Sequence, residues 1–484
     1  MNKYYLRMEG VNLNNYVYDT QRLSVIRGGG LLLLNGVTEL QKAMKDKGTI
    51  LTDISTGASS GLFSFSVADD AGAVKVKEEA EEFFYDHKEL RHATFVVDVL
   101  PYDEEFKLIR ESSLALNRWQ QMQSLSLKVP ENDSTKGVCE HDFIRPADPV
   151  ETGPKKKTKE NKEAGTRIST SAFLRHEYGR KQKQNYYKDY TKGIVNPPEF
   201  TNNFEELSAN KEMGDLHHKI AFFYADGNGF GKLQFDTCLK EDEQKAFDIA
   251  IKAYRVELLT KIINACTDLL KNPKKDKLQF ETLLWGGDEL IFVVPAWQGW
   301  WLAEKFFEYT RNWNFLENNL THGASLIFCH HNSPIHRIRD LAVTLAELAK
   351  KKSRKQNLLA YQVLESFDHL GTSPDEYRKK LCPPGIDGDD LIIDGDSLAG
   401  VRQAFITIRD RFPRRQLHAI IRNLHGTSVD GQREVLEDAE KMCKEIFAIS
   451  ESDIHILQSC FGSGALFWFH LAELWDYVGV EAGQ

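Results

Sequence analysis

One twelve-residue stretch, residues 283–294, constrains the fold more than any other part of the sequence. It reads LLWGGDELIFVV, with an apolar run on each side of Gly286-Gly287-Asp288-Glu289. Runs rich in Leu, Ile, Val and Phe suit strands, and paired glycines can adopt the positive φ angles of a two-residue turn. The pattern therefore predicts a β-hairpin with two carboxylates at its tip, at a protein edge rather than in a core.

A second acidic turn lies upstream, in residues 219–231, which read KIAFFYADGNGFG. The apolar run predicts a strand over 220–225 that ends at Asp226, and a glycine-rich turn then leads into a helical pattern. Asp226, Asp288 and Glu289 would offer hard oxygen ligands from two neighbouring strands. Such a set is typical of sites that hold Mg²⁺ against a nucleoside triphosphate.

Composition limits the class of protein. With 484 residues the chain is long enough for about three domains. A formal charge of −9 excludes a surface that attracts nucleic acid everywhere, so any such site must be local. The seven cysteines are scattered, and neither a secretory signal nor an apolar run of ~18 residues is present, so we expect a cytoplasmic protein without a membrane partner.

The chain reads as one α+β unit present twice. The first copy has a strand, a glycine-interrupted helical pattern, a hairpin, a helix, a strand and a helix, predicted at 4–11, 16–45, 50–68, 74–88, 93–100 and 104–123. The second copy repeats this order around the acidic turns, with further elements predicted at 241–270, 297–312, 323–329, 335–352 and 357–364. The first copy has STGASSG, residues 55–61, where the second has GGDE. It is therefore expected to support the site without binding metal in the same way.

The remaining segments differ in character. Residues 151–165 are polar and predict a flexible linker. Residues 175–190 are basic and rich in tyrosine, which suits either RNA contact through phosphates and stacking or a solvated helix. Apolar stripes predict four C-terminal helices that form a bundle, at 398–412, 413–424, 432–447 and 461–478.

A GGDEL hairpin that follows a strand ending in Asp resembles the palm of nucleotidyl cyclases, both the GGDEF diguanylate cyclases and the CRISPR polymerase family. Three further segments resemble the second family: residues 323–352, with Ser333-Pro334-Ile335 before a helix ending in Ala-Lys; residues 8–34, similar to its first palm; and Val138-Cys139-Glu140-His141 with Arg145-Pro146-Ala147, similar to its zinc-binding insertion. The chain is identified as a relative of the large subunit of type III CRISPR effectors.

This resemblance implies an α+β fold with two ferredoxin-like palm domains of the GGDEF/cyclase type. The implied domains are a degenerate first palm at 1–127, a basic insertion at 128–214, a catalytic palm at 215–372 and a C-terminal helical domain at 373–484. The implied reaction joins the 3′-hydroxyl of one nucleoside triphosphate, expected to be ATP, to the α-phosphate of another. Pyrophosphate leaves, and a cyclic oligonucleotide messenger of prokaryotic antiviral defence results.

The resemblance also implies roles at the site. Asp226 and Asp288 would hold Mg²⁺ or Mn²⁺, and Glu289 would complete the metal shell or help to deprotonate the attacking hydroxyl. Lys350 would neutralise the β- and γ-phosphates, or would instead be one of three solvated lysines. The residues expected to bind the nucleotide are Gly227, Asn228, Gly229, Phe230, Gly231, Gly286, Gly287 and Lys350.

Three departures from the family keep alternatives open. No His-Asp nuclease motif is present, so we expect a relative without the HD nuclease domain. Glu289 stands where the family usually has a second Asp, and Cys139 with His141 are too few ligands for structural zinc. The alternatives are a non-catalytic scaffold that binds RNA or effector subunits, and a diguanylate cyclase with a GTP-specific product. Two palms in one chain can hold two nucleotides, so a homodimer is not required.

Overall fold

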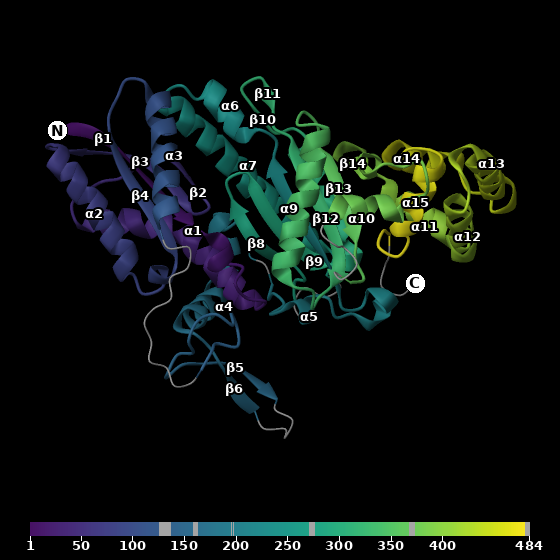
Figure 1. Cartoon of the computed structure of the whole chain (residues 1–484), viewed down its shortest axis with the longest axis horizontal. Helices are drawn as coiled ribbons and strands as arrows, with labels where there is room; N and C mark the ends of the chain where they lie inside the picture. Colours follow the sequence, from purple (N-terminus) through teal and green to yellow (C-terminus); the bar gives the residue numbers. More distant parts are fainter. Residues whose placement is uncertain are drawn as a thin grey trace. The chain divides into compact units, whose positions relative to one another are not determined.

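The computed structural model describes residues 1–124, 137–157, 163–194, 196, 198–270, 276–366 and 373–479 (Figure 1). The chain forms two compact units. The first comprises Met1–Pro197, Gly229–Glu257 and Leu283–Gly287, and the second comprises Pro198–Asn228, Leu258–Thr282 and Asp288–Gln484. Within the described ranges, no helix has both the length and the apolar character that a bilayer crossing requires.

The first unit contains a four-stranded antiparallel sheet in the order β2-β3-β1-β4. Its strands are β1 (Asn2–Val11), β2 (Thr52–Gly57), β3 (Ser60–Val67) and β4 (Thr94–Pro101). The central strand β1 pairs with β3 and β4, and Leu6 lies opposite Phe63 on one side and Val99 on the other. The predicted strands and hairpin of the first copy are confirmed.

Helices cover both faces of this sheet because successive side chains of β1 point to opposite sides. On one face, Leu6 and Met8 join a core that includes residues of α1 (Leu23–Asp46) and α2 (Asp70–Asp86). On the other face, Tyr5 packs with Phe106 of α3 (Phe106–Gln123).

Helix α1 runs unbroken through Gly28-Gly29-Gly30, so the predicted interruption is absent. The glycines instead allow close contact with α4 (Thr170–Tyr190), which lies alongside α1 (Figure 1). A Cβ atom on Gly28 would lie 1.7 Å from the carbonyl oxygen of Arg175, and one on Gly179 would lie 2.2 Å from that of Ser24. Only glycine fits at either position of this helix crossing.

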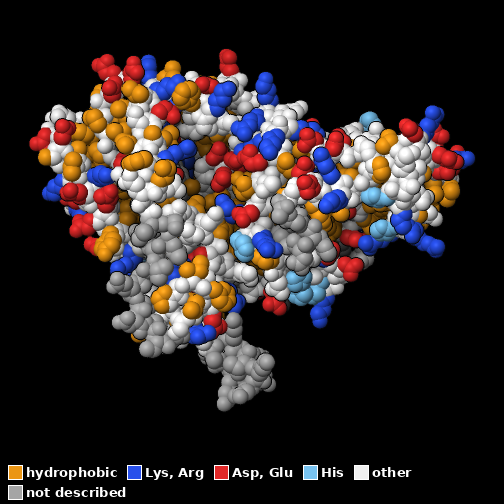
Figure 2. Space-filling view, in the orientation of Figure 1, with side chains coloured by type: hydrophobic (Ala, Val, Ile, Leu, Met, Phe, Trp, Pro, Cys, Tyr) orange, Lys and Arg blue, Asp and Glu red, His pale blue; other side chains and the backbone are white. Residues whose placement is uncertain are grey.

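The basic helix α4 is used for packing. Arg175, Lys183 and Tyr187 are buried, and Arg175 forms an ion pair with Asp19 at 2.7 Å. These side chains therefore cannot contribute to an RNA-binding surface. On the face drawn in Figure 2, Lys and Arg side chains are interspersed with Asp and Glu.

The interpretation of residues 151–165 as a flexible linker is wrong for the part that the structure describes. Residues Thr152–Lys157 (β5) and Glu163–Arg167 (β6) form an antiparallel pair. The intervening residues 158–162 lie outside the described ranges. A polar strand pair carries little hydrophobic alternation, which explains why the sequence pattern did not reveal it.

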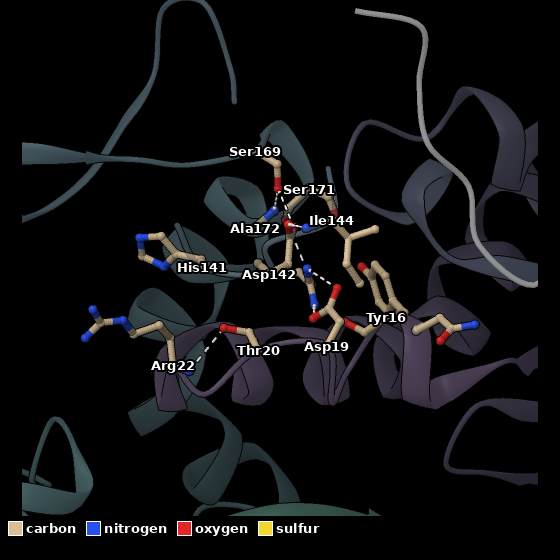
Figure 3. Close-up of polar contacts among 12 residues, drawn as sticks. Tyr16, Asp19, Thr20, Arg22, His141, Asp142, Ile144, Ser169, Ser171 and Ala172 are labelled. Carbon is tan, nitrogen blue, oxygen red and sulfur yellow. Dashed lines mark hydrogen bonds and ion pairs between the residues drawn. The ribbon is translucent and has the colours of Figure 1, made fainter. Parts of the chain in front are cut away.

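Buried ion pairs anchor the segment that resembles a zinc insertion (Figure 3). The guanidinium of Arg145 lies 2.5 Å from Asp19 and 3.2 Å from Asp142, and these three side chains are at most 1% exposed. Ser169 donates a hydrogen bond of 2.8 Å to Asp142. Burial raises the pKa of Asp142, but hydrogen bonds from the backbone of Arg145 and Ile144 bring it below its usual range.

The second sheet has six strands in the order β14-β13-β12-β7-β9-β8. They are β7 (Lys219–Gly227), β8 (Glu281–Gly286), β9 (Glu289–Pro295), β12 (His322–His330), β13 (Leu358–Val363) and β14 (Ile392–Asp394). The order β8-β9-β7-β12 repeats the order β2-β3-β1-β4 of the first sheet. The predicted GGDE hairpin is confirmed, and the repeated strand order is what the predicted internal duplication requires.

Helices α8 (Gly299–Thr310) and α9 (Ile335–Lys352) pack on opposite faces of this sheet. A Cβ on Gly299 would lie 2.4 Å from the Cβ of Ala221, which places α8 on the Ala221 face. Ser325 of β12 donates a hydrogen bond of 2.8 Å to the carbonyl of Ala342 in α9. Asp226 pairs with Gly323, two residues before Ser325, so the Asp226 side chain faces α9.

The C-terminal region is helical, as predicted, and the helix expected at 432–447 is present because α13 continues as a π-helical turn over Met442–Ile446, whereas α14 was not predicted. Its helices are α10 (Pro374–Leu381), α11 (Val401–Arg411), α12 (Arg414–His425), α13 (Gln432–Lys441), α14 (Glu451–Phe461) and α15 (Ala465–Glu473). The remaining elements are α5 (Phe204–Leu207), α6 (Phe230–Thr237), α7 (Glu241–Asp268), β10 (Asn314–Phe315) and β11 (Asn318–Asn319).

Candidate functional site

Three carboxylates lie at one end of the second sheet. Asp226 is near the end of β7, Asp288 is in the hairpin turn, and Glu289 begins β9. Asp226 and Glu289 are partners in the antiparallel register, and the backbone N–H of Gly227 donates to the carbonyl of Asp288 at 3.1 Å. We call Asp226, Asp288 and Glu289 the acidic end.

Electrostatic repulsion at the acidic end is strong. Burial, followed by the negative charge of Asp288, raises the pKa of Asp226 to about 7. The ammonium of Lys350, in the last turn of α9, opposes this shift by an ion pair with Asp226. The side chains of Lys350 and Asp226 are 6% and 14% exposed. Lys350 is therefore not a solvated lysine, and that alternative is wrong.

Glu289 is oriented by Tyr224, which lies outside the set of residues predicted for the site. The hydroxyl of Tyr224 donates a hydrogen bond of 3.0 Å to Glu289. Burial, together with the charges of Glu289 and Asp226, raises the pKa of Tyr224, so this hydroxyl stays protonated and remains a donor. The signal was present in the sequence: Tyr224 stands two residues before Asp226 on a strand, on the same face.

Asn228 holds the turn after β7. Its backbone N–H donates to the carbonyl of Thr321 at 2.8 Å, and its side-chain amide donates to the Thr321 hydroxyl at 3.0 Å and to the carbonyl of Gln356 at 2.9 Å. These bonds fix the turn that carries Asp226. The expected nucleotide contact of Asn228 stays a prediction.

Gly229, Phe230 and Gly231 belong to the first compact unit. Gly229 has a φ of 68° and precedes α6, and a Cβ on Gly231 would meet open space. Both positions thus leave backbone accessible at a helix start. Phe230 is buried and packs edge-to-face on Phe247 at 6.2 Å. Its side chain therefore serves the core.

The hairpin glycines also belong to the first unit, and they differ from each other. A Cβ on Gly286 would lie 2.0 Å from the Cβ of Ala58, so Gly286 permits close contact with the β2–β3 hairpin. Gly287 is exposed, has a φ of 55°, and would place a Cβ in open space. The neighbouring Trp285 is buried and packs on Tyr190 at 5.8 Å.

The donor chemistry of the acidic end suits Mg²⁺ or Mn²⁺. Within the described residues, no group of three or more His, Cys, Asp or Glu side chains is placed to hold a metal ion. Mg²⁺, however, is usually held by one or two carboxylates together with water and substrate phosphates. Asp226 and Asp288 fit that role, since the charge of Asp288 acts directly on Asp226.

Cys139 and His141 serve packing and hydrogen bonding. The thiol of Cys139 is buried among Val25, Ile168 and Ala172. His141 is buried too, and its Nε2 lies 2.8 Å from the hydroxyl of Thr166. These contacts account for the two residues of the zinc-like segment without a metal.

The strand order, the acidic end and the helical C-terminal region can be compared with known folds. No family model and no curated protein matches the sequence. Among solved structures, Csm1 of T. onnurineus superposes with a TM-score of 0.57 at 10% identity, over 99% of this chain and 70% of that chain. The chain has the fold of Csm1. Csm1 is a Cas10 subunit of type III CRISPR systems, so the predicted resemblance is confirmed in structure.

A second Csm1 structure gives the same result. Csm1 in the Csm1-Csm4 cassette in complex with pppApA superposes with a TM-score of 0.52 at 11% identity, again over 99% of this chain and 70% of that chain. The agreement with Csm1 therefore extends along the chain and includes both sheets and the C-terminal helices. At these identities the likeness establishes the fold alone.

Proposed function

We propose that the chain is a Mg²⁺- or Mn²⁺-dependent nucleotidyltransferase that joins nucleoside triphosphates into a cyclic oligonucleotide messenger of antiviral defence. ATP is the proposed substrate, and pyrophosphate is the leaving group. The observation that carries this proposal is the acidic end, where three carboxylates from two neighbouring strands lie together in a chain with the fold of Csm1.

The known structures support the choice of nucleotide. One Csm1 structure of the same fold is a complex with pppApA, an adenylate dinucleotide that keeps a 5′-triphosphate. Such a molecule is what results when the 3′-hydroxyl of one ATP has attacked the α-phosphate of another. We extend this substrate class to the present chain.

We further propose that each sheet with its helices is a ferredoxin-like palm domain. The support is the strand order β2-β3-β1-β4, repeated as β8-β9-β7-β12. The proposed domains remain those expected from the sequence: first palm 1–127, insertion 128–214, catalytic palm 215–372 and helical domain 373–484. In this assignment only the second palm has carboxylates at its hairpin.

Each residue of the site has its own role in the proposed reaction. Asp226 and Asp288 would hold the metal ions, whose chemistry is to neutralise phosphate charge and to acidify the attacking 3′-hydroxyl. Glu289, held by Tyr224, would orient the hydroxyl or an outer-shell water. Lys350 would contact the β- and γ-phosphates. The backbone of residues 227–231 and of Gly286-Gly287 would bind the triphosphate.

The first experiment is a product assay. Purified protein is incubated with each nucleoside triphosphate, and with all four, in Mg²⁺ or Mn²⁺, and the products are identified by mass spectrometry. We expect a cyclic adenylate that disappears in Asp288→Ala. Asp242→Ala removes a carboxylate that is 97% exposed and should leave the product unchanged. Full synthesis by Asp288→Ala would refute the proposed site.

One observation favours a second candidate, a scaffold subunit that no longer turns over nucleotides. In the structure the ammonium of Lys350 forms an ion pair with the Asp226 carboxylate, where a metal ion would bind. The described residues also present no set of three metal ligands. A scaffold would bind effector subunits such as a Csm4-like protein and would give no product even with RNA added. A product restricted to GTP would instead indicate diguanylate cyclase activity.

A further inference from the structure

The ion pair between Lys350 and Asp226 depends on a missing side chain. Lys350 reaches Asp226 by crossing β12 at Gly323, the register partner of Asp226. A Cβ on Gly323 would lie 2.6 Å from Cγ of Lys350 and 3.1 Å from the carbonyl oxygen of Ala346. The backbone of Gly323 is ordinary strand, so what matters here is space rather than a special conformation.

The charges at the acidic end are unbalanced. Asp226 carries the repulsion of both Asp288 and Glu289 and is largely removed from water. Among the described residues, Lys350 is the cation that forms an ion pair with this group of carboxylates. A buried carboxylate without a counter-charge is strongly unfavourable, so a cation beside Asp226 stabilises its ionised form.

The ammonium of Lys350 has a second possible ion-pair partner. Glu347, one helical turn earlier, has its carboxylate 3.8 Å from the Lys350 ammonium. The last turn of α9, to which Lys350 belongs, also exposes carbonyl groups that favour a positive charge. The ammonium can therefore leave Asp226 and keep a favourable environment within the same helix turn.

We propose that Lys350 is an exchangeable counter-ion, and that Gly323 is the positioning residue that gives it access to Asp226. Lys350 neutralises Asp226 while the acidic end holds no divalent cation. When a divalent cation binds Asp226, the ammonium moves toward Glu347 and the phosphates of the arriving nucleotide. The inference rests on the proposed function in one respect, that a divalent cation binds at Asp226.

The test measures Mn²⁺ binding to the nucleotide-free protein by electron paramagnetic resonance, which needs no turnover. Lys350→Met keeps the length of the side chain and removes its charge. Because a competing cation is lost, we expect Mn²⁺ to bind about tenfold more tightly. Lys351→Met removes an exposed charge from the same helix turn and should change the affinity less than about twofold, since solvent screens it.

Gly323→Ala provides a second variant that leaves every charge in place. Its Cβ displaces the stem of Lys350, so the affinity for Mn²⁺ should rise by a smaller factor than in Lys350→Met. In Asp226→Asn the metal ligand itself is lost. The addition of Lys350→Met to that variant should then give no gain in Mn²⁺ affinity.

Unchanged or weaker Mn²⁺ binding in Lys350→Met, with circular dichroism as for the wild type, would overturn the proposal. An equal gain in Mn²⁺ affinity in Lys351→Met would also overturn the proposal, because the loss of any nearby positive charge would then explain the gain in both variants. If Lys350→Met gains affinity but the wild type makes no oligonucleotide, the counter-ion exchange stands and the proposed synthesis fails. If Lys350→Met does not fold, the Mn²⁺ affinity of Gly323→Ala decides the question: a gain supports the proposal, and no gain overturns it.

Discussion

Individual side chains at the acidic end take their roles from neighbours that are distant in sequence. Asp226 is paired with Lys350, 124 positions away, and Glu289 accepts a hydrogen bond from Tyr224 across the strand pair. The sequence predicted the three carboxylates because each lies in or beside a glycine-containing turn next to an apolar run. It could not choose between phosphate ligand and solvated residue for Lys350, since that choice depends on the space above Gly323.

Tyr224→Phe should impair catalysis without affecting the fold. The variant keeps the buried ring and removes the donor that orients Glu289. If Glu289 takes part in the proposed reaction, the rate of product formation should fall by about tenfold, as is usual when a partner of a functional carboxylate is removed. The measurement is kcat with thermal unfolding as a check, and Tyr85→Phe, at an exposed tyrosine, is the control.

A buried histidine predicts a pH dependence of stability. His470 on α15 is fully buried and lies 2.7 Å from the hydroxyl of Tyr361, and burial lowers the pKa of His470 to about 3. An unfolded histidine has a pKa near ~6.5, so between these values the unfolded state binds more protons. The contribution of His470 to stability is therefore lost as the pH falls, by about 2 kcal/mol between pH 7 and pH 5, while the carboxyl of Glu473, whose pKa burial raises to about 7, acts in the opposite direction.

Urea unfolding at the two pH values measures this loss. His470→Gln offers an acceptor for Tyr361 and does not titrate, so its change in stability from pH 7 to pH 5 should be more favourable than that of the wild type by about 2 kcal/mol. His455→Gln replaces an exposed histidine of α14 and should leave the wild-type difference in place. An identical pH dependence in His470→Gln and the wild type would contradict the assignment.

At the level of elements, glycines decide how helices approach each other. The run Gly28-Gly29-Gly30 of α1 reads in the sequence as a helix break, yet α1 is continuous, and Gly28 of α1 and Gly179 of α4 form the crossing of the two helices. Periodicity predicts which residues form a helix, but it cannot reveal a partner helix that arrives more than a hundred residues later. The polar β5–β6 pair escaped prediction for a similar reason, because a neighbouring strand rather than hydrophobic alternation defines it.

Gly28→Ala should destabilise the first unit. The added methyl group would collide with the backbone of Arg175, and overpacking of this kind costs about 1–3 kcal/mol or more. Gly36→Ala in the same helix is the matched control, because its Cβ would meet no atom closer than 3.5 Å. Since alanine favours helix over glycine, that variant should be neutral or more stable by up to ~1 kcal/mol.

Chemical denaturation of both variants decides the matter. A loss of stability in Gly28→Ala alone assigns the glycine to the helix crossing. Equal losses in both variants would show instead that α1 is sensitive to any added methyl group, and would contradict the special role of Gly28.

The molecule as a whole consists of two compact units, and its cysteines report on each of them. All seven thiols are free and buried. Cys139 and Cys238 lie in the first unit, and the second unit holds Cys266, Cys329, Cys382, Cys443 and Cys460. The scattered, odd-numbered cysteines of the sequence implied no disulfide framework. The sequence did not predict how the chain divides into the two units, because strands and helices of the second copy contribute to both units.

Thiol labelling under increasing urea should therefore proceed in two steps. Native protein should not react with Ellman's reagent, since burial protects every thiol. If each unit unfolds cooperatively, one step should expose two thiols and the other five. Mass spectrometry of the labelled peptides identifies the step. A single step of seven thiols would show that the units unfold together.

The ion pair between Lys350 and Asp226 also affects the stability of the protein when no divalent cation is bound. Many enzymes with clustered carboxylates lose rigidity when a chelator removes their metal, because the negative charges then repel each other. Here the chain supplies its own positive charge to the most strongly repelled carboxylate. Prolonged exposure to a chelator should therefore leave the melting temperature unchanged, and the protein could be kept idle in a cell without an ion to hold its strands in place.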